Sequence, residues 1–402
     1  MTDPAPPLSG VRVLDLSRIL AGPFATMMLA DLGAEVIKIE PPGGDDTRTW
    51  GPPFAGGESA YFLAVNRGKK SVVLNLKTDR GREDLERLLD RADVVVENFR
   101  PGTLARLGFP ADDVLARRPR IVWCSISAYG QYGPLASLPG YDAIMQGEAG
   151  WMGLTGPPEG PPTKVGASLA DITAAMMASS GILAALFDRE RTGRGRRVDV
   201  ALFDSVVATL TYQAQGALLT GDEPARSGNC HPSLTPYESF EAKDGHVIVG
   251  VGNDAAWQRF CAACAPDLNR PEYRANPDRV RRRAELRARL EPRFRERTVE
   301  AWEQLLGEAE IPVGRVRSML DILRSPQLAA RGMVVSREHP TVGTLRLVGN
   351  PIQYDGVPHT AEGPPPTRGQ HTAEVLTRAA AMMAGPGAGS PSPSPPSPRR
   401  SA

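Results

Sequence analysis

The N-terminal third of the chain alternates short apolar runs with stretches of helical spacing. The runs 11–17 (VRVLDLS) and 34–40 (AEVIKIE) are typical of strands, and 22–33 (GPFATMMLADLG) between them has helical spacing. Together they span about 30 residues, the size of a βαβ unit. More strands are predicted at 70–76, 92–98 and 120–126, with a helix at 81–92. Nearly continuous apolar strands that alternate with helices predict a parallel sheet covered on both faces, and therefore a doubly wound α/β domain.

The pattern changes along the rest of the chain. Helical spacing from Asp171 to Phe187 ends at Gly193 and Gly195, before a strand-like run at 197–203 and a helical stretch to about Leu219. The run 237–252 (YESFEAKDGHVIVGVG) predicts a β-hairpin, because Asp244-Gly245 is a turn signal. A charged helical region at 281–297 follows, and apolar β-like runs resume at 332–340 and 344–350.

These changes predict four parts. Residues 1–224 form the N-terminal part of the large α/β domain, 225–330 a smaller α+β domain, and 331–384 a segment that returns to the large domain. Residues 385–402 (GPGAGSPSPSPPSPRRSA) are rich in Pro, Ser and Gly, so burial could not offset the entropy lost on ordering them. We expect a disordered tail there.

The charges of the chain are balanced. Lys and Arg number 47 and Asp and Glu 46, so no net field recruits nucleic acid or a membrane, and local groups must hold any anionic ligand. The start, MTDPAPPLSG, resembles neither a secretion signal nor a transit peptide, which indicates a cytoplasmic protein, or a mitochondrial-matrix protein in a eukaryote. The apolar run 172–187 is bounded by charges and is too short to span a membrane.

Four scattered cysteines suit a reducing compartment. Cys261 and Cys264 form a C-x-x-C, but no second pair completes a zinc site, and we expect no metal. Helical spacing places both on one face, so buried helix residues are the favoured interpretation and a redox pair is the lesser one.

Several motifs follow one another in a fixed order: LAGPFATMMLADLGAEVIKIEPPGGDDTRTWGPPF (20–54), NRGKKSVVLNLK (66–77), VVVENFRPGTLARLGF (94–109), SISAYGQYGPLASLPGYD (125–142) and SLADITAAMM (168–177). Together they resemble family III CoA transferases, and the resemblance spans about residues 8–378. It implies a Rossmann-like large domain, a small domain, and an interlaced homodimer of two ring-like chains.

The resemblance also implies the substrates. These would be an acyl-CoA and a carboxylic acid, with no tightly bound cofactor. Within the family, DDTRTWGPPF (45–54) and EHPTVG (338–343) are most similar to members that take CoA from succinyl-CoA to glutarate or a related dicarboxylate.

In the family, an aspartate nucleophile occupies the position of Asp171. A carboxylate can relay CoA without losing the thioester's energy to water, because it forms first an anhydride and then an enzyme thioester. Ser168-x-x-Asp171 before an apolar helix is also a capping pattern, in which Asp171 would only stabilise the helix start. The surrounding family motif favours the nucleophile.

Gly250, Gly252 and Asn253 match a family glycine loop that closes over the active site, where backbone N–H groups would stabilise an oxyanion. The run is poorer in glycine than that of formyl-CoA transferases. An ordinary strand end is an equally good interpretation.

By resemblance, coenzyme A contacts residues in four places: Ile19, Leu20 and Ala21; Leu74 to Lys77; Asn98, Phe99 and Arg100; and Arg106. Lys77, Arg100 and Arg106 suit phosphate groups, although surface solubility is the default role of a single Lys or Arg. Leu20 and Pro41 stand where formyl-CoA transferases carry glutamine and arginine, so those two side-chain contacts are not transferred.

Lys164, seven residues before Asp171 in GPPTKVGAS (160–168), is a candidate partner for the second carboxylate of a dicarboxylate. Burying this second carboxylate without a partner would cost free energy, so a cation or several hydrogen-bond donors must contact it. An exposed loop lysine is at least as good an interpretation. Tyr129 and Tyr141 could position substrate, but aromatic residues after glycines are more often packing anchors, and we assign them no catalytic role.

Other functions compete with CoA transfer to a dicarboxylate. One is transfer to formate or another monocarboxylate. A 2-methylacyl-CoA racemase shares the fold but needs a histidine base, and residues 124–150 contain no histidine. A nicotinamide-dependent oxidoreductase would need a glycine fingerprint after the first strand, which is missing. A non-catalytic CoA-binding protein would not need Asp171 and the two loop glycines.

Overall fold

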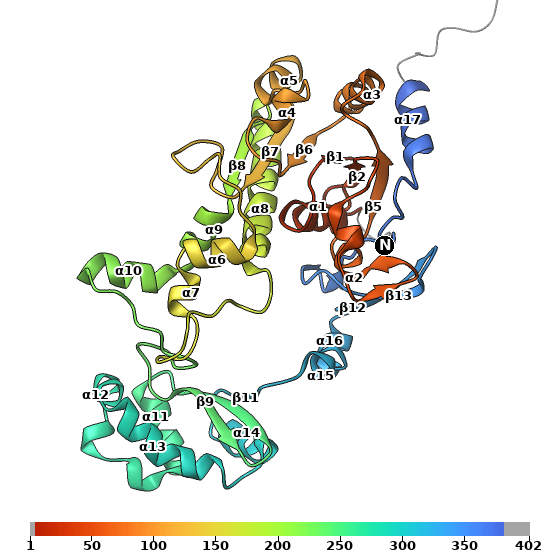
Figure 1. The fold of residues 1–402 in the computed structure, drawn as a ribbon. Coiled ribbons are helices and arrows are strands. Elements are labelled where there is room, and N and C mark those ends of the chain that lie inside the picture. Colours follow the sequence, from red (N-terminus) through yellow and green to blue (C-terminus); the bar gives the residue numbers. More distant parts are fainter. Residues whose placement is uncertain (1–4, 382–402) are drawn as a thin grey trace, which may run out of the picture. The chain divides into compact units, whose positions relative to one another are not determined.

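A computed structural model describes residues 5–381, so the expected tail at 385–402 lies outside the described residues. Figure 1 shows the course of the chain through its helices and strands. The chain divides into two compact units. The first comprises Met1–Gly140, Asp171–Ser205 and the C-terminal part from Val335, and the second comprises Tyr141–Ala170 and Val206–Val334.

A six-stranded sheet organises the first unit, and all of its pairings are parallel. Its strands are β1 (Arg12–Asp15), β2 (Glu35–Glu40), β5 (Lys69–Val73), β6 (Val94–Glu97), β7 (Val122–Ser127) and β8 (Arg197–Ala201). The order is β5-β2-β1-β6-β7-β8, so the chain winds outward from β1 to one edge and then from β6 to the other. The predicted doubly wound domain is confirmed.

Helices cover both faces of this sheet. Apolar side chains of α3 (Asp79–Leu89), α4 (Thr103–Arg106), α5 (Ala111–Arg117) and α17 (Thr372–Ala381) share one buried cluster with Leu14, Ile37 and Val95 of the strands. On the other face, Thr26 of α1 (Ala21–Asp31) donates to Asp15 of β1 at 2.7 Å. Successive side chains of a strand point to opposite faces of the sheet, so each short apolar run supplies side chains to both faces.

Helix α8 (Leu169–Thr192) lies beside α1, where Ser179 donates to the carbonyl of Ala25. By length and composition alone this helix could cross a membrane, so the expectation that its apolar run is too short was wrong, because the helix extends beyond 172–187 at both ends. Ala174, Ala178 and Ile182 along one face are fully buried within the protein. This is the pattern of a core helix that covers a sheet.

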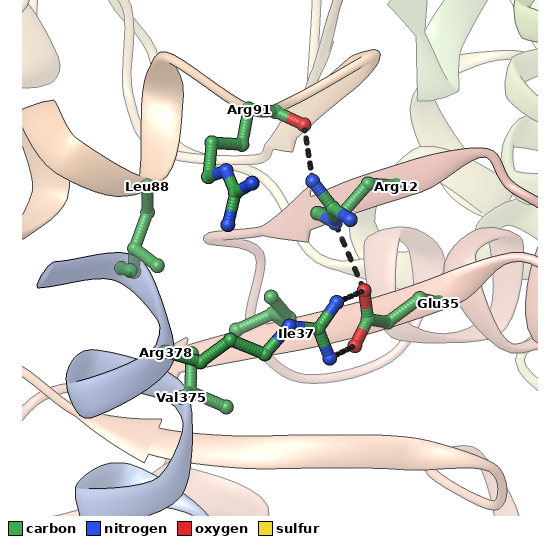
Figure 2. Close-up of a pocket in the computed structure, with 8 residues that line it drawn as sticks. Arg12, Glu35, Ile37, Leu88, Arg91, Val375 and Arg378 are labelled. Carbon is green, nitrogen blue, oxygen red and sulfur yellow. Dashed lines mark hydrogen bonds and ion pairs between the residues drawn. The ribbon is translucent and has the colours of Figure 1, made fainter. Parts of the chain in front are cut away.

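Helix α17 is docked at the amino ends of β1 and β2. Val375 is buried in the cluster, and Arg378 donates to Glu35 at 3.1 and 3.2 Å. Figure 2 shows that Arg12 donates to the same carboxylate, at 2.9 Å, and to the carbonyl of Arg91, at 3.2 Å. The cavity among these side chains is about 20 Å³, roughly the space of one water molecule. It is therefore a docking contact and not a ligand site.

The second unit contains a small antiparallel sheet, β11-β10-β9. Its strands are β9 (Tyr237–Ala242), β10 (Gly245–Gly250) and β11 (Val313–Arg315). The predicted hairpin is confirmed, but its turn is Lys243-Asp244 and not Asp244-Gly245, because Gly245 already pairs with Ala242. Helices α11 (Asp254–Cys264), α12 (Asn276–Arg281), α13 (Arg283–Phe294) and α14 (Val299–Glu308) complete it. A core containing Trp257, Phe260 and Trp302 joins the sheet to the helices, which confirms an α+β unit.

Cys261 and Cys264 lie on α11 as free thiols. Cys261 is part of the core, and Cys264 packs against it. Burial raises the pKa of both thiols to about 12, which leaves almost no thiolate at neutral pH. The interpretation as a buried helix residue is confirmed for Cys261, whereas Cys264 is only partly buried.

The second unit is larger than the predicted 225–330. It also takes in α6 (Asp142–Glu148), α7 (Trp151–Leu154) and α10 (Thr211–Thr220). Backbone contacts explain this: Gly228 donates to the carbonyl of Gly156 at 3.1 Å, and Arg226 donates to that of Gly160 at 2.8 Å. Such long-range contacts leave no signal in local sequence patterns.

The remaining elements are short. They are α2 (Ala60–Ala64), α9 (Leu202–Thr209), α15 (Met319–Leu323), α16 (Pro326–Ala330), β3 (Phe54–Ala55), β4 (Glu58–Ser59), β12 (Val334–His339), β13 (Gly343–Val348), β14 (Gln353–Tyr354) and β15 (Val357–Pro358). Strands β12 and β13 confirm the β-like runs predicted after Pro326.

Candidate active site

Three of the segments expected to contact CoA lie at one edge of the large sheet. Ile19–Ala21 follow β1, Asn98–Arg100 follow β6, and Leu74–Lys77 follow β5. The carboxyl ends of parallel strands meet at one edge, and ligands bind where the strand order reverses, which here is between β1 and β6. The three segments thus lie at the edge of the sheet where a parallel α/β fold usually binds its ligand.

The loop from β1 to α1 is tied to the end of β6. The side-chain amide of Asn98 accepts from the N–H of Arg18 at 2.8 Å and donates to its carbonyl at 2.7 Å. The guanidinium of Arg18 also lies over the ring of Phe99, 5.6 Å from its centroid. Asn98 was expected as a CoA contact, and in the structure its side chain holds the neighbouring loop.

Ile19 has an unusual backbone conformation, with φ at +71°. A β-branched residue is strained in the left-handed region, at a cost of about 1–3 kcal/mol, and such strain persists only where the surroundings enforce it. Leu20 then precedes α1 without a side-chain cap. A Cβ at Gly22 would stand 2.2 Å from Ser17, so glycine is needed for α1 to start so close to the loop.

Buried charged groups lie beneath this loop. Lys38 and Asp45, both with fully buried side chains, are paired at 2.8 Å, and Lys69 pairs with Asp15 at 2.9 Å. The sequence pattern was interpreted only as apolar strands, so these residues were missed. The signal was present for two of them, because Asp15 interrupts the apolar run 11–17 and Lys38 interrupts the run 34–40. Lys69 is the first residue of β5 and interrupts no apolar run.

The Lys38–Asp45 pair favours the charged form of both its groups, whereas burial lowers the pKa of Lys69 to about 8. Burial disfavours the charged ammonium of Lys38, but the carboxylates of Asp15, Asp45 and Glu40 outweigh it and raise its pKa. Burial likewise opposes the charge on Asp45, but the ammonium of Lys38 lowers the pKa of that carboxyl. Fixed charges in a buried place hold their hydrogen-bond partners in a defined geometry.

Lys77, Arg100 and Arg106 are exposed near this edge of the sheet. Among the described residues none of the three forms an ion pair, and Arg106 donates only to the hydroxyl of Thr103, at 3.0 Å. Exposed cations without a carboxylate partner are available to phosphate. Their role in binding CoA stays a prediction.

Asp171 is the third residue of α8 and is partly buried. The N–H of the preceding residue, Ala170, donates to Asp142 at 2.8 Å. The side chain of Gln146 donates to Asp142 at 2.8 Å and accepts from the N–H of Val165, also at 2.8 Å. Asp142 and Gln146 lie one turn apart on α6, and together they hold the segment that leads to Asp171. The sequence alone indicated no role for Asp142, the last residue of the motif 125–142, or for Gln146.

Gly250, Gly252 and Asn253 connect β10 to α11 in the second unit. Gly250 ends the strand, and a Cβ there would stand 2.6 Å from the ring of Tyr237. Asn253 caps α11 by accepting from the N–H of Ala256 at 2.8 Å. Only Gly252 has open space around it, and it is exposed. A strand end with a helix cap thus accounts for Gly250 and Asn253, and Gly252 has no structural requirement.

Lys164 is exposed and donates to the carbonyl of Val165 at 3.2 Å. Lys164 directly precedes Val165, whose N–H donates to the side chain of Gln146. Lys164 therefore lies on a loop that is attached to α6. Tyr129 packs against Phe203 with ring centroids 5.7 Å apart, whereas Tyr141 is 61% exposed. Packing is therefore confirmed for Tyr129 but does not describe Tyr141.

Comparison with known proteins places this geometry in a family. The profile of CoA-transferase family III matches residues 8–372. A succinyl-CoA:glutarate CoA-transferase of Mus musculus is 44% identical over 93% of this chain and 86% of its own length, and an acetyl-CoA:oxalate CoA-transferase of Acetobacter aceti is 42% identical over 90% and 93%.

A solved structure is also similar. A CAIB/BAIF family protein from Brucella suis is 37% identical, covers 93% of this chain and 99% of its own, and superposes with a TM-score of 0.84. The sequence and structure comparisons each cover 93% of this chain. The chain belongs to CoA-transferase family III.

Proposed function

We propose that this protein transfers CoA from succinyl-CoA to glutarate or a related dicarboxylate, with Asp171 as the relay. The observation that carries the proposal is the similarity to a succinyl-CoA:glutarate CoA-transferase over 93% of the chain. In this chain the SLAD motif places Asp171 in the first turn of α8. The positive end of a helix dipole stabilises negative charge in that turn.

The proposed reaction has two symmetrical halves. The Asp171 carboxylate attacks the thioester carbonyl of succinyl-CoA, which forms a mixed anhydride and releases CoA thiolate. The thiolate attacks the aspartyl carbonyl of the anhydride, which leaves succinate and an aspartyl-CoA thioester. The acceptor carboxylate then displaces CoA to form a second anhydride, and the thiolate attacks its acyl carbonyl. The product acyl-CoA and the free Asp171 carboxylate result.

The CoA nucleotide is proposed to bind at the carboxyl edge of β5, β1 and β6. The unpaired cations Lys77, Arg100 and Arg106 support this place, because phosphates need charge-assisted donors. The reversal of strand order between β1 and β6 supports it independently. No tightly bound cofactor is needed, because the thioester itself carries the transferable energy.

The acid pair is tested with a substrate panel. We expect succinyl-CoA with glutarate to give glutaryl-CoA, measured by mass spectrometry, faster than acetyl-CoA with oxalate, the pair named for the Acetobacter relative. Preference for acetyl-CoA with oxalate, or for monocarboxylate acceptors, would contradict the proposed pair. Hydrolysis without transfer would contradict CoA transfer itself.

Lys164 is proposed to bind the second carboxylate of the acceptor. Lys164→Met should raise the KM for glutarate about tenfold to a hundredfold, because a hydrogen bond between charged groups is lost. The KM for pentanoate, which has the same length and one carboxylate, should change little. Equal effects on both acids would remove Lys164 from the acceptor site.

The active form is proposed to be a homodimer. Large apolar side chains are exposed on helices: Met176, Met177 and Phe187 of α8, Leu218 and Leu219 of α10, and Met319 and Leu320 of α15. Each of these helices exposes at least two large apolar side chains, which favours an interface, so a second copy of the chain is their proposed cover.

A further inference from the structure

The loop between β1 and α1 is held at three consecutive residues. Lys38 Nζ donates to the carbonyl of Ser17 at 2.9 Å. Asn98 binds both backbone groups of Arg18. The N–H of Ile19 lies 3.3 Å from each carboxylate oxygen of Asp45. The last of these three residues, Ile19, is also the first residue of the segment Ile19–Ala21, which the proposed function assigns to CoA.

Lys38 and Asp45 form a buried ion pair within this arrangement. Their side chains are fully buried and 2.8 Å apart, and Asp45 also accepts from the N–H and hydroxyl of Thr47, at 3.0 and 2.8 Å. Two buried charges are no more stabilising than a well-packed apolar pair of similar size, so such a pair need not be present for stability. A carboxylate here does what an apolar group cannot, because it accepts from the N–H of Ile19.

The backbone conformation of Ile19 explains why this hydrogen bond matters. Its φ of +71° is unfavourable for a β-branched side chain and directs the chain abruptly into α1. Without a partner at the N–H, the segment would relax to an ordinary conformation. The backbone groups of Ile19–Ala21 would then leave the positions at which a ligand meets them.

We propose that the buried Lys38–Asp45 pair positions Ile19–Ala21 for CoA, holding Ile19 in its left-handed conformation. Lys38 and Asp45 touch no substrate in this account, and they act through the loop. The proposal rests on the proposed function, because it assumes that Ile19–Ala21 meet CoA.

The same unit offers a matched control. Asp31 and Arg67 are also buried, 4% exposed each, and are joined at 2.9 and 2.5 Å. Asp31 accepts from the N–H of Ala361 at 2.9 Å, and Arg67 donates to the carbonyl of Val348 at 2.9 Å. This pair therefore holds C-terminal segments and not the β1–α1 loop.

The experiment compares Asp45→Asn with Asp31→Asn in the full-length protein. Each variant leaves a buried cation without its charged partner, so both should lower the melting temperature. Only Asp45→Asn should weaken binding of free CoA, measured by titration calorimetry, by about tenfold or more, with a matching rise in the KM for succinyl-CoA and a smaller change in kcat. Asp31→Asn should bind CoA within about twofold of the wild type.

CoA binding that is equal in Asp45→Asn and wild type would overturn the positioning role, and so would equal weakening in both variants. Should Asp45→Asn fail to fold, Asp45→Glu replaces it, because it keeps the charge beside Lys38 but moves the oxygens away from Ile19. Wild-type affinity in Asp45→Glu would then overturn the role. A wild-type protein that binds no CoA would instead contradict the proposed function.

Discussion

At the scale of single residues, the carboxyl end of β6 carries an acid with an unusual proton affinity. Glu97 is 7% exposed, and burial raises the pKa of its carboxyl from 4.5 to about 7, although hydrogen bonds from Ser125 and the N–H of Phe99 favour the charge. The folded state therefore binds this proton more tightly than the unfolded state. Its contribution to stability is complete below about pH 4.5 and is lost as the pH rises through about 7.

Glu97→Gln imitates the protonated acid and should remove this dependence. At a pH above 7 the variant should be more stable than the wild type by up to about 3 kcal/mol, and the difference should vanish toward pH 4.5. Urea unfolding across this range measures both curves. Parallel curves for the two proteins would show that Glu97 does not titrate as described.

At the scale of elements, local pattern was enough for the helices and strands of the sheet but not for their buried charges. Apolar spacing identified β1, β2 and β5, and the hairpin of β9 and β10 followed from its turn signal. The same strands carry Asp15, Lys38 and Lys69, whose pairing depends on which strands become neighbours. That order arises from chain winding, so single-sequence periodicity could not show it. The family motifs supplied Asp171 but gave no role to Asp142 and Gln146, which hold the residues before it.

The segment between β10 and α11 can be tested at this scale too. Gly252 has open space for a side chain, so Gly252→Val should leave the melting temperature unchanged. If its backbone approaches the acyl group, transfer should slow or thioester hydrolysis should rise, because the valine blocks that approach. Gly314→Val is the control, since Gly314 on β11 of the same sheet also has open space around it. Unchanged kinetics in Gly252→Val would leave the segment as a strand end with a helix cap.

At the scale of the whole molecule, the two units are interleaved in sequence. The first unit is assembled from three stretches of chain, and α8 begins at the boundary with the second. The doubly wound sheet was predictable because its strands alternate with helices in sequence. The extent of the second unit was not, because contacts such as Gly156 with Gly228 join residues far apart in sequence. Asp171 is the first residue of the first unit after this boundary, so the proposed nucleophile stands where the chain passes from one unit to the other.

The central claim is that Asp171 carries CoA covalently, and transfer of oxygen tests it most directly. Glutarate whose carboxylates carry heavy oxygen should leave one heavy oxygen on the Asp171 side chain after a single turnover with succinyl-CoA, because the second anhydride breaks at the glutaryl carbonyl. Peptide mass spectrometry locates the label, and Asp171→Asn should be folded, unlabelled and inactive. Turnover that leaves Asp171 unlabelled, or near-normal transfer by Asp171→Asn, would contradict the account.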